Sequence, residues 1–325
     1  MNPESKPFDF PDVDVVIPTF NSREKLRICL ESLINQEYPG SINIYIVDGG
    51  STDGTVELAR QYTNTVFVVQ GIYMFGKNGA RNLGERLGKS KYVLSLDSDN
   101  YLTGTKTLRN LVLPFLEQPL LNISIPIPII KYSGDLLSNW LSVMETINLL
   151  GFFRTGKISS RAYSVIPDLS YGLPNASIVR REDLQLAYGT DTDVRLLCRL
   201  RSLGRARAAI VANAHFYHDQ TEGVRDYVNK WTRRITRYSK MKEEDLDRYF
   251  INIESTKLEG MELRKNTLKE RAGIIKTSLR MILKTRRKLW FGVIVYAFCW
   301  TAIVLYHPLR FLRMQKSYFS IRADQ

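Results

Sequence analysis

The sequence has few of the residues from which disulfide frameworks and zinc sites are built. Its three cysteines, Cys29, Cys198 and Cys299, lie far apart, and none belongs to a CxxC or Cys/His ligand pattern. This spacing argues against both kinds of site and fits a reducing compartment. The N-terminal residues also lack an apolar run, so no secretory signal is predicted there. We therefore expect the part of the chain that carries chemistry to stay in the cytosol.

Net charge is absent from the first two thirds of the chain. Residues 1–224 contain 23 basic and 23 acidic side chains, whereas residues 225–325 contain 23 basic and 10 acidic ones. The whole net charge of +13 therefore lies in the C-terminal part. Such a segment favours a polyanion, and anionic lipid headgroups and nucleic acid are the two candidates.

Short β-branched runs alternate with helical patterns over the first hundred residues, and this alternation predicts βαβ units with a parallel sheet. The middle of the chain, 123–188, is less regular. Because ligands bind at the carboxyl ends of the strands in such a sheet, we expect the polar residues there to converge. These residues are Thr19, Asn21, Asp48, Asp97 and Asp99. Strands are predicted over 14–17, 42–47, 66–69, 92–96, 175–179 and 208–212, and helices over 23–36, from 55, and over 78–87, 138–150 and 191–203.

An uncharged run, LWFGVIVYAFCWTAIVLY, covers residues 289–306. Its length is close to the roughly 20 residues that a helix needs to cross a bilayer core, and its aromatic residues suit an interface. The basic flank 284–288 argues against a buried core helix. Basic residues also follow the run, so the charge asymmetry across it is weak. The sequence predicts a membrane segment over 289–308 and leaves open whether it spans the bilayer or lies in its plane.

The strongest chemical signal is Asp97–Ser98–Asp99, which directly follows the apolar run 92–96. Two carboxylates one residue apart at the end of a strand can share a divalent cation that also holds a diphosphate. Oxygen ligands favour Mg²⁺ or Mn²⁺. An isolated Asp-x-Asp is usually a solvated turn or a helix cap, so its interpretation depends on the motifs around it.

Three motifs precede it, VIPTFN at 16–21, VDGGSTDGT at 47–55 and GARNLG at 79–84. In this order and spacing the four motifs resemble family 2 glycosyltransferases of the GT-A fold, over about residues 13–220. The resemblance implies a Rossmann-like mixed α/β sheet flanked by helices. It also implies a UDP- or GDP-sugar donor and inversion at the anomeric carbon.

By matching position, the resemblance places the nucleotide near the first two motifs. Pro18, Thr19 and Asn21 would line its pocket. Asp48 would accept a hydrogen bond from the base N–H, which a carboxylate can do. The alternative is that Asp48 and Asp53 are turn and helix-cap residues, and for Asp53 we prefer that alternative.

The other implied roles concern the diphosphate and the metal. Arg81 would lie near the diphosphate or its partner carboxylates, since a guanidinium suits phosphate oxygens; the alternative is a surface helix residue. Asp97, with Ser98, would bind the nucleotide sugar, and Asp97 and Asp99 the metal. His218 is a candidate third ligand, although a lone His is more often structural.

A general base is predicted at Asp191, which begins the predicted helix 191–203. The surrounding residues resemble the family's Glu-Asp motif, whose Asp takes the proton of the acceptor hydroxyl. Capping of the helix by Thr190 or Asp191 is the alternative, and the two roles are compatible. The sequence departs from the family where Thr190 replaces the usual Glu and Gly49 a common Asp.

Together these observations predict an inverting, metal-dependent hexosyltransferase. It would move a single sugar to a lipid-linked or polyprenyl-phosphate acceptor at the cell membrane, with its catalytic domain in the cytoplasm. The predicted parts are an extension (1–12), a GT-A catalytic domain (13–222), a basic helical region (223–288), the membrane segment (289–308) and a basic tail (309–325).

Two other functions are weighed against this one. A nucleotidyltransferase should show a Gly-rich loop with Arg or Lys after the first strand, and residues 18–23 lack it. A non-enzymatic module that binds lipid or nucleic acid would not need the carboxylates. We expect no nucleic acid partner, because the basic segment lacks interleaved aromatic residues and adjoins the apolar run.

Overall fold

The computed structural model describes residues 9–70, 76–129, 135–151, 162–169, 176–186, 193–219, 223–238, 276, 280, 283 and 291–306. The chain divides into two compact units. Unit 1 comprises Met1–Ile127 and Phe153–Tyr217, and unit 2 comprises Pro128–Phe152 and His218–Gln325.

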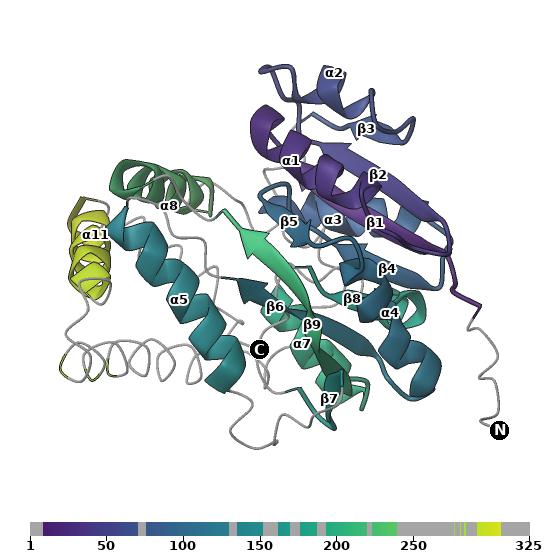
Figure 1. The fold of residues 1–325 in the computed structure, drawn as a ribbon. Coiled ribbons are helices and arrows are strands. Elements are labelled where there is room, and N and C mark those ends of the chain that lie inside the picture. The colour runs from purple at the N-terminus through teal and green to yellow at the C-terminus, as the bar shows by residue number, and fades with distance from the viewer. Residues whose placement is uncertain are drawn as a thin grey trace, which may run out of the picture. The chain divides into compact units, whose positions relative to one another are not determined.

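Unit 1 is a mixed α/β sheet flanked by helices (Figure 1). The described strands form a nine-stranded sheet in the order β3-β2-β1-β4-β8-β6-β9-β5, with β7 paired to β9. The first four of these pair in parallel, as the alternating pattern predicted, and β8 is antiparallel to both β4 and β6. The strands are β1 (Val13–Thr19), β2 (Ile42–Asp48), β3 (Val66–Val68), β4 (Tyr92–Ser95), β5 (Asn100–Thr103), β6 (Ile123–Ile129), β7 (Tyr163–Ile166), β8 (Ile178–Arg180) and β9 (Ala208–His218).

The core of unit 1 lies between the sheet and its helices. All seven residues of β1 are buried, as expected for a strand covered on both faces. Helix α1 buries Leu26, Cys29, Leu30 and Leu33, whose spacing forms one face of a helix. The helices of this unit are α1 (Arg23–Ile34), α2 (Thr55–Ala59), α3 (Gly76–Leu87), α4 (Thr107–Glu117), α6 (Arg181–Leu186) and α7 (Asp193–Ser202).

Unit 2 contains α5 (Leu136–Gly151), α8 (Val224–Tyr238) and α11 (Gly292–Tyr306). Helix α11 contacts both α5 and α8 around a core that includes Trp140, Tyr227 and Cys299. A Cβ on Gly292 would lie 2.3 Å from the Cβ of Trp140, so the close approach of α11 to α5 requires glycine there. Among the described residues, none of the helices combines the length and the apolar character that crossing a membrane requires.

Candidate functional site

The carboxyl ends of β1 and β2 lie side by side, because Thr19 is in register with Asp48. The buried Asp48 carboxylate accepts hydrogen bonds from the N–H groups of Gly50 and Ser51, at 2.8 and 2.7 Å. Its other oxygen accepts one from the Ser51 hydroxyl at 2.5 Å. A turn role is thus observed for Asp48, and its contact with a nucleotide base stays a prediction.

The loop after β1 is tied to the loop after β2. Asn21 has a φ of 47°, which Asn tolerates better than most residues. Its side-chain oxygen accepts a hydrogen bond from the Thr52 N–H at 2.9 Å, and its own N–H donates to the Ser51 hydroxyl at 2.7 Å. Pro18 and Thr19 are buried at the end of β1. The Thr19 hydroxyl has no hydrogen-bond partner within the described part of the chain, so a bound ligand could satisfy it.

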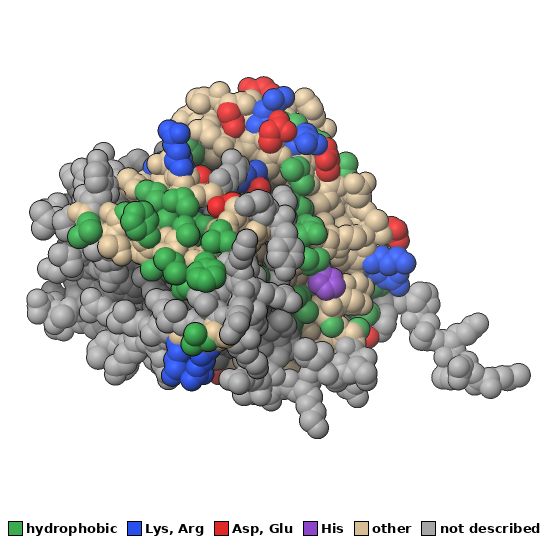
Figure 2. Space-filling model, turned by 60° about the vertical axis from the view of Figure 1, so that its left-hand side comes forward, with side chains coloured by type: hydrophobic (Ala, Val, Ile, Leu, Met, Phe, Trp, Pro, Cys, Tyr) green, Lys and Arg blue, Asp and Glu red, His purple; other side chains and the backbone are tan. Residues whose placement is uncertain are grey.

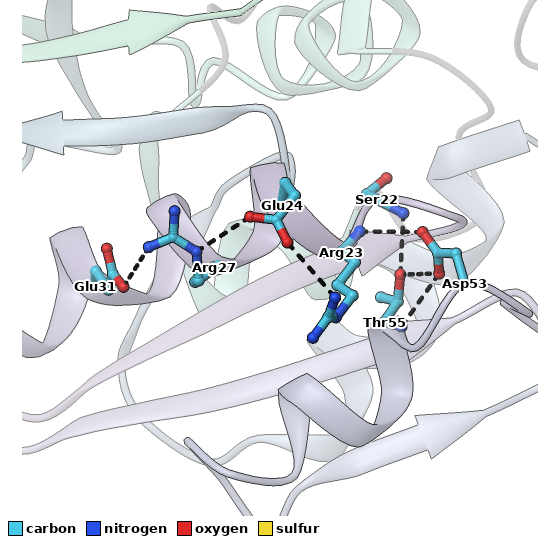
Figure 3. A network of polar contacts seen from close by, with 7 residues as sticks. All are labelled: Ser22, Arg23, Glu24, Arg27, Glu31, Asp53 and Thr55. Carbon is cyan, nitrogen blue, oxygen red and sulfur yellow. Dashed lines mark hydrogen bonds and ion pairs between the residues drawn. The ribbon is translucent and has the colours of Figure 1, made fainter.

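Asp53 links the starts of two helices, as Figure 3 shows. Its carboxylate accepts hydrogen bonds from the Arg23 N–H of α1 at 3.2 Å, and from the Thr55 N–H and hydroxyl of α2 at 3.1 and 2.5 Å. Burial disfavours the charged form, but these hydrogen bonds outweigh it and lower the pKa of Asp53. Asp53 thus has the local structural role preferred for it, because it bonds the first N–H of each helix, although the N-cap position of α2 is Gly54.

Asp97 is clamped between two cations at the carboxyl end of β4. Arg81 donates to Asp97 Oδ1 at 2.9 Å, and Lys77 Nζ lies 2.5 Å from Asp97 Oδ2. The Arg81 and Asp97 side chains are only 7% and 11% exposed, whereas that of Lys77 is 40% exposed. The alternative that Arg81 is a surface residue is therefore wrong. Sequence reasoning missed Lys77, although its spacing of four residues from Arg81 places both on one helix face.

Helix α3 can present these cations because it packs directly on the sheet. A Cβ on Gly84 would lie 2.5 Å from Val16 Cγ1 of β1 and 3.2 Å from Val47 Cγ2 of β2, so glycine allows this close contact. The helix runs back across parallel strands, and its first turns therefore lie at their carboxyl ends. Lys77 and Arg81 belong to those turns.

The turn after β4 brings the second carboxylate to the same region. The Asn100 N–H donates to the Asp97 carbonyl at 2.9 Å, and the Cys29 thiol lies 3.9 Å from that carbonyl. Burial, and then the charges of Asp99 and Asp97, raise the pKa of Cys29, so both carboxylates act on one buried thiol. Ser98 and Asp99 are half-buried. The fully buried Asn100 amide has no hydrogen-bond partner among the described residues.

The oxygen donors of this turn suit a hard cation that takes part of its shell from a substrate. Mg²⁺ is commonly held by one or two carboxylates together with substrate phosphates. Asp99 and Asp97 provide that set, although both Asp97 oxygens are also paired with cations. Within the described residues, no group of three His, Cys, Asp or Glu side chains could hold a metal without such help.

Two predicted site residues stay predictions. Asp191 lies outside the described residues, and α7 begins at Asp193. His218 is the last residue of β9. Burial lowers the pKa of His215, which lies on the same strand.

Comparisons with known proteins agree with the motifs. The family model "Glycosyl transferase family 2" matches residues 14–182. A poly(ribitol-phosphate) beta-glucosyltransferase of Bacillus spizizenii is 33% identical over 102 residues, covering 30% of this chain and 16% of that protein. An Escherichia coli protein, UDP-Glc:alpha-D-GlcNAc-diphosphoundecaprenol beta-1,3-glucosyltransferase WfaP, is 32% identical over 95 residues, covering 29% and 38%. The aligned part thus spans well under half of either relative.

Among solved structures, TarS 1–349 of S. aureus in complex with UDP is similar over 91% of each chain, with 17% identity and a TM-score of 0.46. The family assignment does not depend on this similarity, because the family model alone covers more than half of the chain. The matched range, 14–182, includes Asp48, Arg81, Asp97 and Asp99. This chain therefore belongs to glycosyl transferase family 2.

Proposed function

We propose that this glycosyltransferase moves a single hexose, with inversion, from a UDP- or GDP-sugar to a lipid-linked or polyprenyl-phosphate acceptor. The catalytic domain would work at the cytoplasmic face of the cell membrane. The observation that carries the proposal is the pairing of Asp97 with Lys77 and Arg81 at the carboxyl ends of the strands. Oriented charges on partly buried side chains suit a diphosphate leaving group.

The residues would divide the work as follows. Thr19, Asn21 and Asp48 would bind the nucleoside, since all three belong to the joined loops after β1 and β2. Arg81 and Lys77 would contact the diphosphate and hold Asp97 in place. Asp97 and Asp99 would hold Mg²⁺ or Mn²⁺, which when bound supplies charge neutralisation for the departing diphosphate.

The nature of the acceptor decides whether a base is needed. A hydroxyl must lose its proton as it attacks the sugar C1, and Asp191 would accept that proton. A phosphate is already anionic and needs no base. The name of the E. coli relative gives its acceptor as alpha-D-GlcNAc-diphosphoundecaprenol, and this supports a lipid-linked acceptor for the present chain.

The test is transfer from UDP- and GDP-hexoses to lipid-linked hydroxyl and phosphate acceptors, with Mn²⁺ or a chelator. For a hydroxyl acceptor, we expect Asp191→Asn to lower single-turnover transfer by about 10²–10⁴-fold with donor affinity nearly unchanged. Asp193→Asn is the matched control and should be milder. If Asp193→Asn alone is inactive, the base is misplaced by two residues. Absence of transfer to any lipid-linked acceptor would contradict the proposal.

A further inference from the structure

Helix α11 of unit 2 has two unlike faces, although no residue in it is charged. One face packs against α5 and α8 and buries Val293 and Cys299, which are 3% and 0% exposed. The other face presents large apolar side chains to the outside. These are Phe291, which directly precedes α11, and Ile294, Phe298 and Leu305 within it; they are 44%, 58%, 70% and 74% exposed. Their spacing of three, four and seven residues places them in one stripe along the helix.

Helix α8 shows what a water-facing helix of this unit looks like. It has the same length as α11, and among its side chains with described burial Arg225, Asn229 and Arg233 form an exposed polar stripe, beside Val224 at 39%. Tyr227, Val228 and Trp231 of α8 pack in the helical core. Contiguous apolar side chains on a surface mark a site of interaction. Figure 2 shows a cluster of hydrophobic side chains on the face of the surface that this view presents.

The charge around α11 identifies the occupant of this face. Residues 271–325 contain eleven basic side chains and one acidic side chain. Lys276 and Arg280 are exposed, and so is Leu283, at 81%. A second copy of the chain would bring the same positive charge and would be repelled. Apolar side chains flanked by basic ones suit the boundary between anionic headgroups and acyl chains.

We infer that α11 lies in the plane of an anionic membrane surface and inserts Phe291, Ile294, Phe298 and Leu305 below the headgroups. Among the described residues, α5 and α8 occupy the opposite face of α11, and this face is exposed. The positive charge of the sequence on both sides of the helix favours anionic headgroups. The inference rests on the membrane association in the proposed function and adds the surface and the mode of binding.

The test measures binding of the full-length chain to two kinds of vesicle, phosphatidylcholine alone and phosphatidylcholine mixed with phosphatidylglycerol. We expect binding to the mixed vesicles, weakened by salt. The double variant Ile294→Ser/Phe298→Ser should bind at least about tenfold more weakly, since each large apolar side chain contributes that much when buried. The control Ile34→Ser/Leu120→Ser removes side chains of unit 1 that are 59% and 78% exposed, and should bind like the unchanged protein.

Equal vesicle binding by the Ile294/Phe298 variant and the unchanged protein would overturn the inference. So would a change of that variant from dimer to monomer in size-exclusion chromatography, which would identify a second copy as the occupant. A UDP-induced rise in melting temperature in both variants shows that they are folded. If the unchanged protein transfers sugar in detergent but does not bind vesicles, this inference fails and the proposed function stands. If the unchanged protein binds the mixed vesicles but transfers no sugar, the proposed function fails and this inference stands.

Discussion

In unit 1, one Asp–Arg pair is buried at the amino ends of the strands and another at their carboxyl ends, called below the amino edge and the carboxyl edge of the sheet. At the amino ends of the strands, Asp14 of β1 pairs with Arg181 at the start of α6. The Asp14 carboxylate also accepts hydrogen bonds from the Ser90 N–H and hydroxyl and from the Asn43 amide, at 2.9, 2.6 and 3.1 Å. Arg181 in turn donates to the Ser90 carbonyl at 2.6 Å. The protein itself satisfies this pair from several sides.

At the carboxyl ends, Asp97 pairs with Arg81, but its second partner, Lys77, is 40% exposed. Two buried polar side chains near this edge, Thr19 and Asn100, have no hydrogen-bond partner within the described residues. Unsatisfied buried polar groups cost stability, and a bound ligand can complete their hydrogen bonds. The difference is that the protein itself satisfies the pair at the amino ends of the strands, whereas the pair at the carboxyl ends leaves neighbouring polar groups for the ligand of the proposed function.

The largest effect is expected from removing a carboxylate at the carboxyl edge. Asp99→Ala should lower transfer by at least about 10³-fold, because the metal would lose a ligand worth several kcal/mol in the transition state. It should also remove the metal dependence of UDP binding. The free energy of unfolding should change by less than about 1 kcal/mol, since Asp99 lies outside the strands and is half-buried. Undiminished, metal-dependent turnover in this variant would reject the assignment.

The reverse result is expected at the amino edge. Asp14→Ala leaves the Arg181 charge buried without its counter-ion, which should lower the free energy of unfolding by about 3–5 kcal/mol. UDP affinity of the folded fraction should be unchanged. The control is Glu31→Ala, which breaks the exposed Arg27–Glu31 pair seen in Figure 3 and should change the free energy by less than about 1 kcal/mol. Urea unfolding measures the free energy of unfolding of both variants. Equal losses in Asp14→Ala and Glu31→Ala would refute the stability role of the Asp14–Arg181 pair.

Only part of this contrast can be predicted from the sequence. The alternation of the first hundred residues predicts the four parallel strands, and thereby places Asp48 and Asp97 at the carboxyl ends of the two strands that flank β1. The Asp14–Arg181 pair cannot be predicted in this way, since its members are 167 residues apart. Strand β6 escapes prediction because Pro126 and Pro128 obscure its pattern, and it pairs with β8 only through Ile123 and Ser124.

A smaller effect is expected from Lys77, which separates binding from stability within the carboxyl edge. Lys77→Ala should weaken donor affinity about tenfold, because one charge-assisted contact to the diphosphate is lost. The unfolding free energy should change little, since the Lys77 side chain is 40% exposed. The matched control is Lys106→Ala, whose ammonium lies 3.9 Å from Glu37 in a pair that is 62% exposed on both sides. Calorimetric titration with UDP measures the donor affinity of the two variants. Equal affinities would exclude Lys77 from the donor site.

The smallest effect is expected from Asp53, whose carboxylate accepts hydrogen bonds from the first N–H groups of α1 and α2. Asp53→Ala should lower the free energy of unfolding by about 1 kcal/mol at neutral pH, the usual worth of a helix cap, with little change in UDP affinity. Its pKa is lowered in the folded protein, so the ionised carboxylate stabilises the fold above its unfolded pKa of about 3.9. That stabilisation is lost as the pH falls through the lowered folded value. In urea unfolding, the unchanged protein and Asp53→Ala should therefore differ in free energy of unfolding at neutral pH and become equal at acid pH. A difference that persists undiminished in acid would mean that packing, rather than the charged cap, accounts for the role of Asp53.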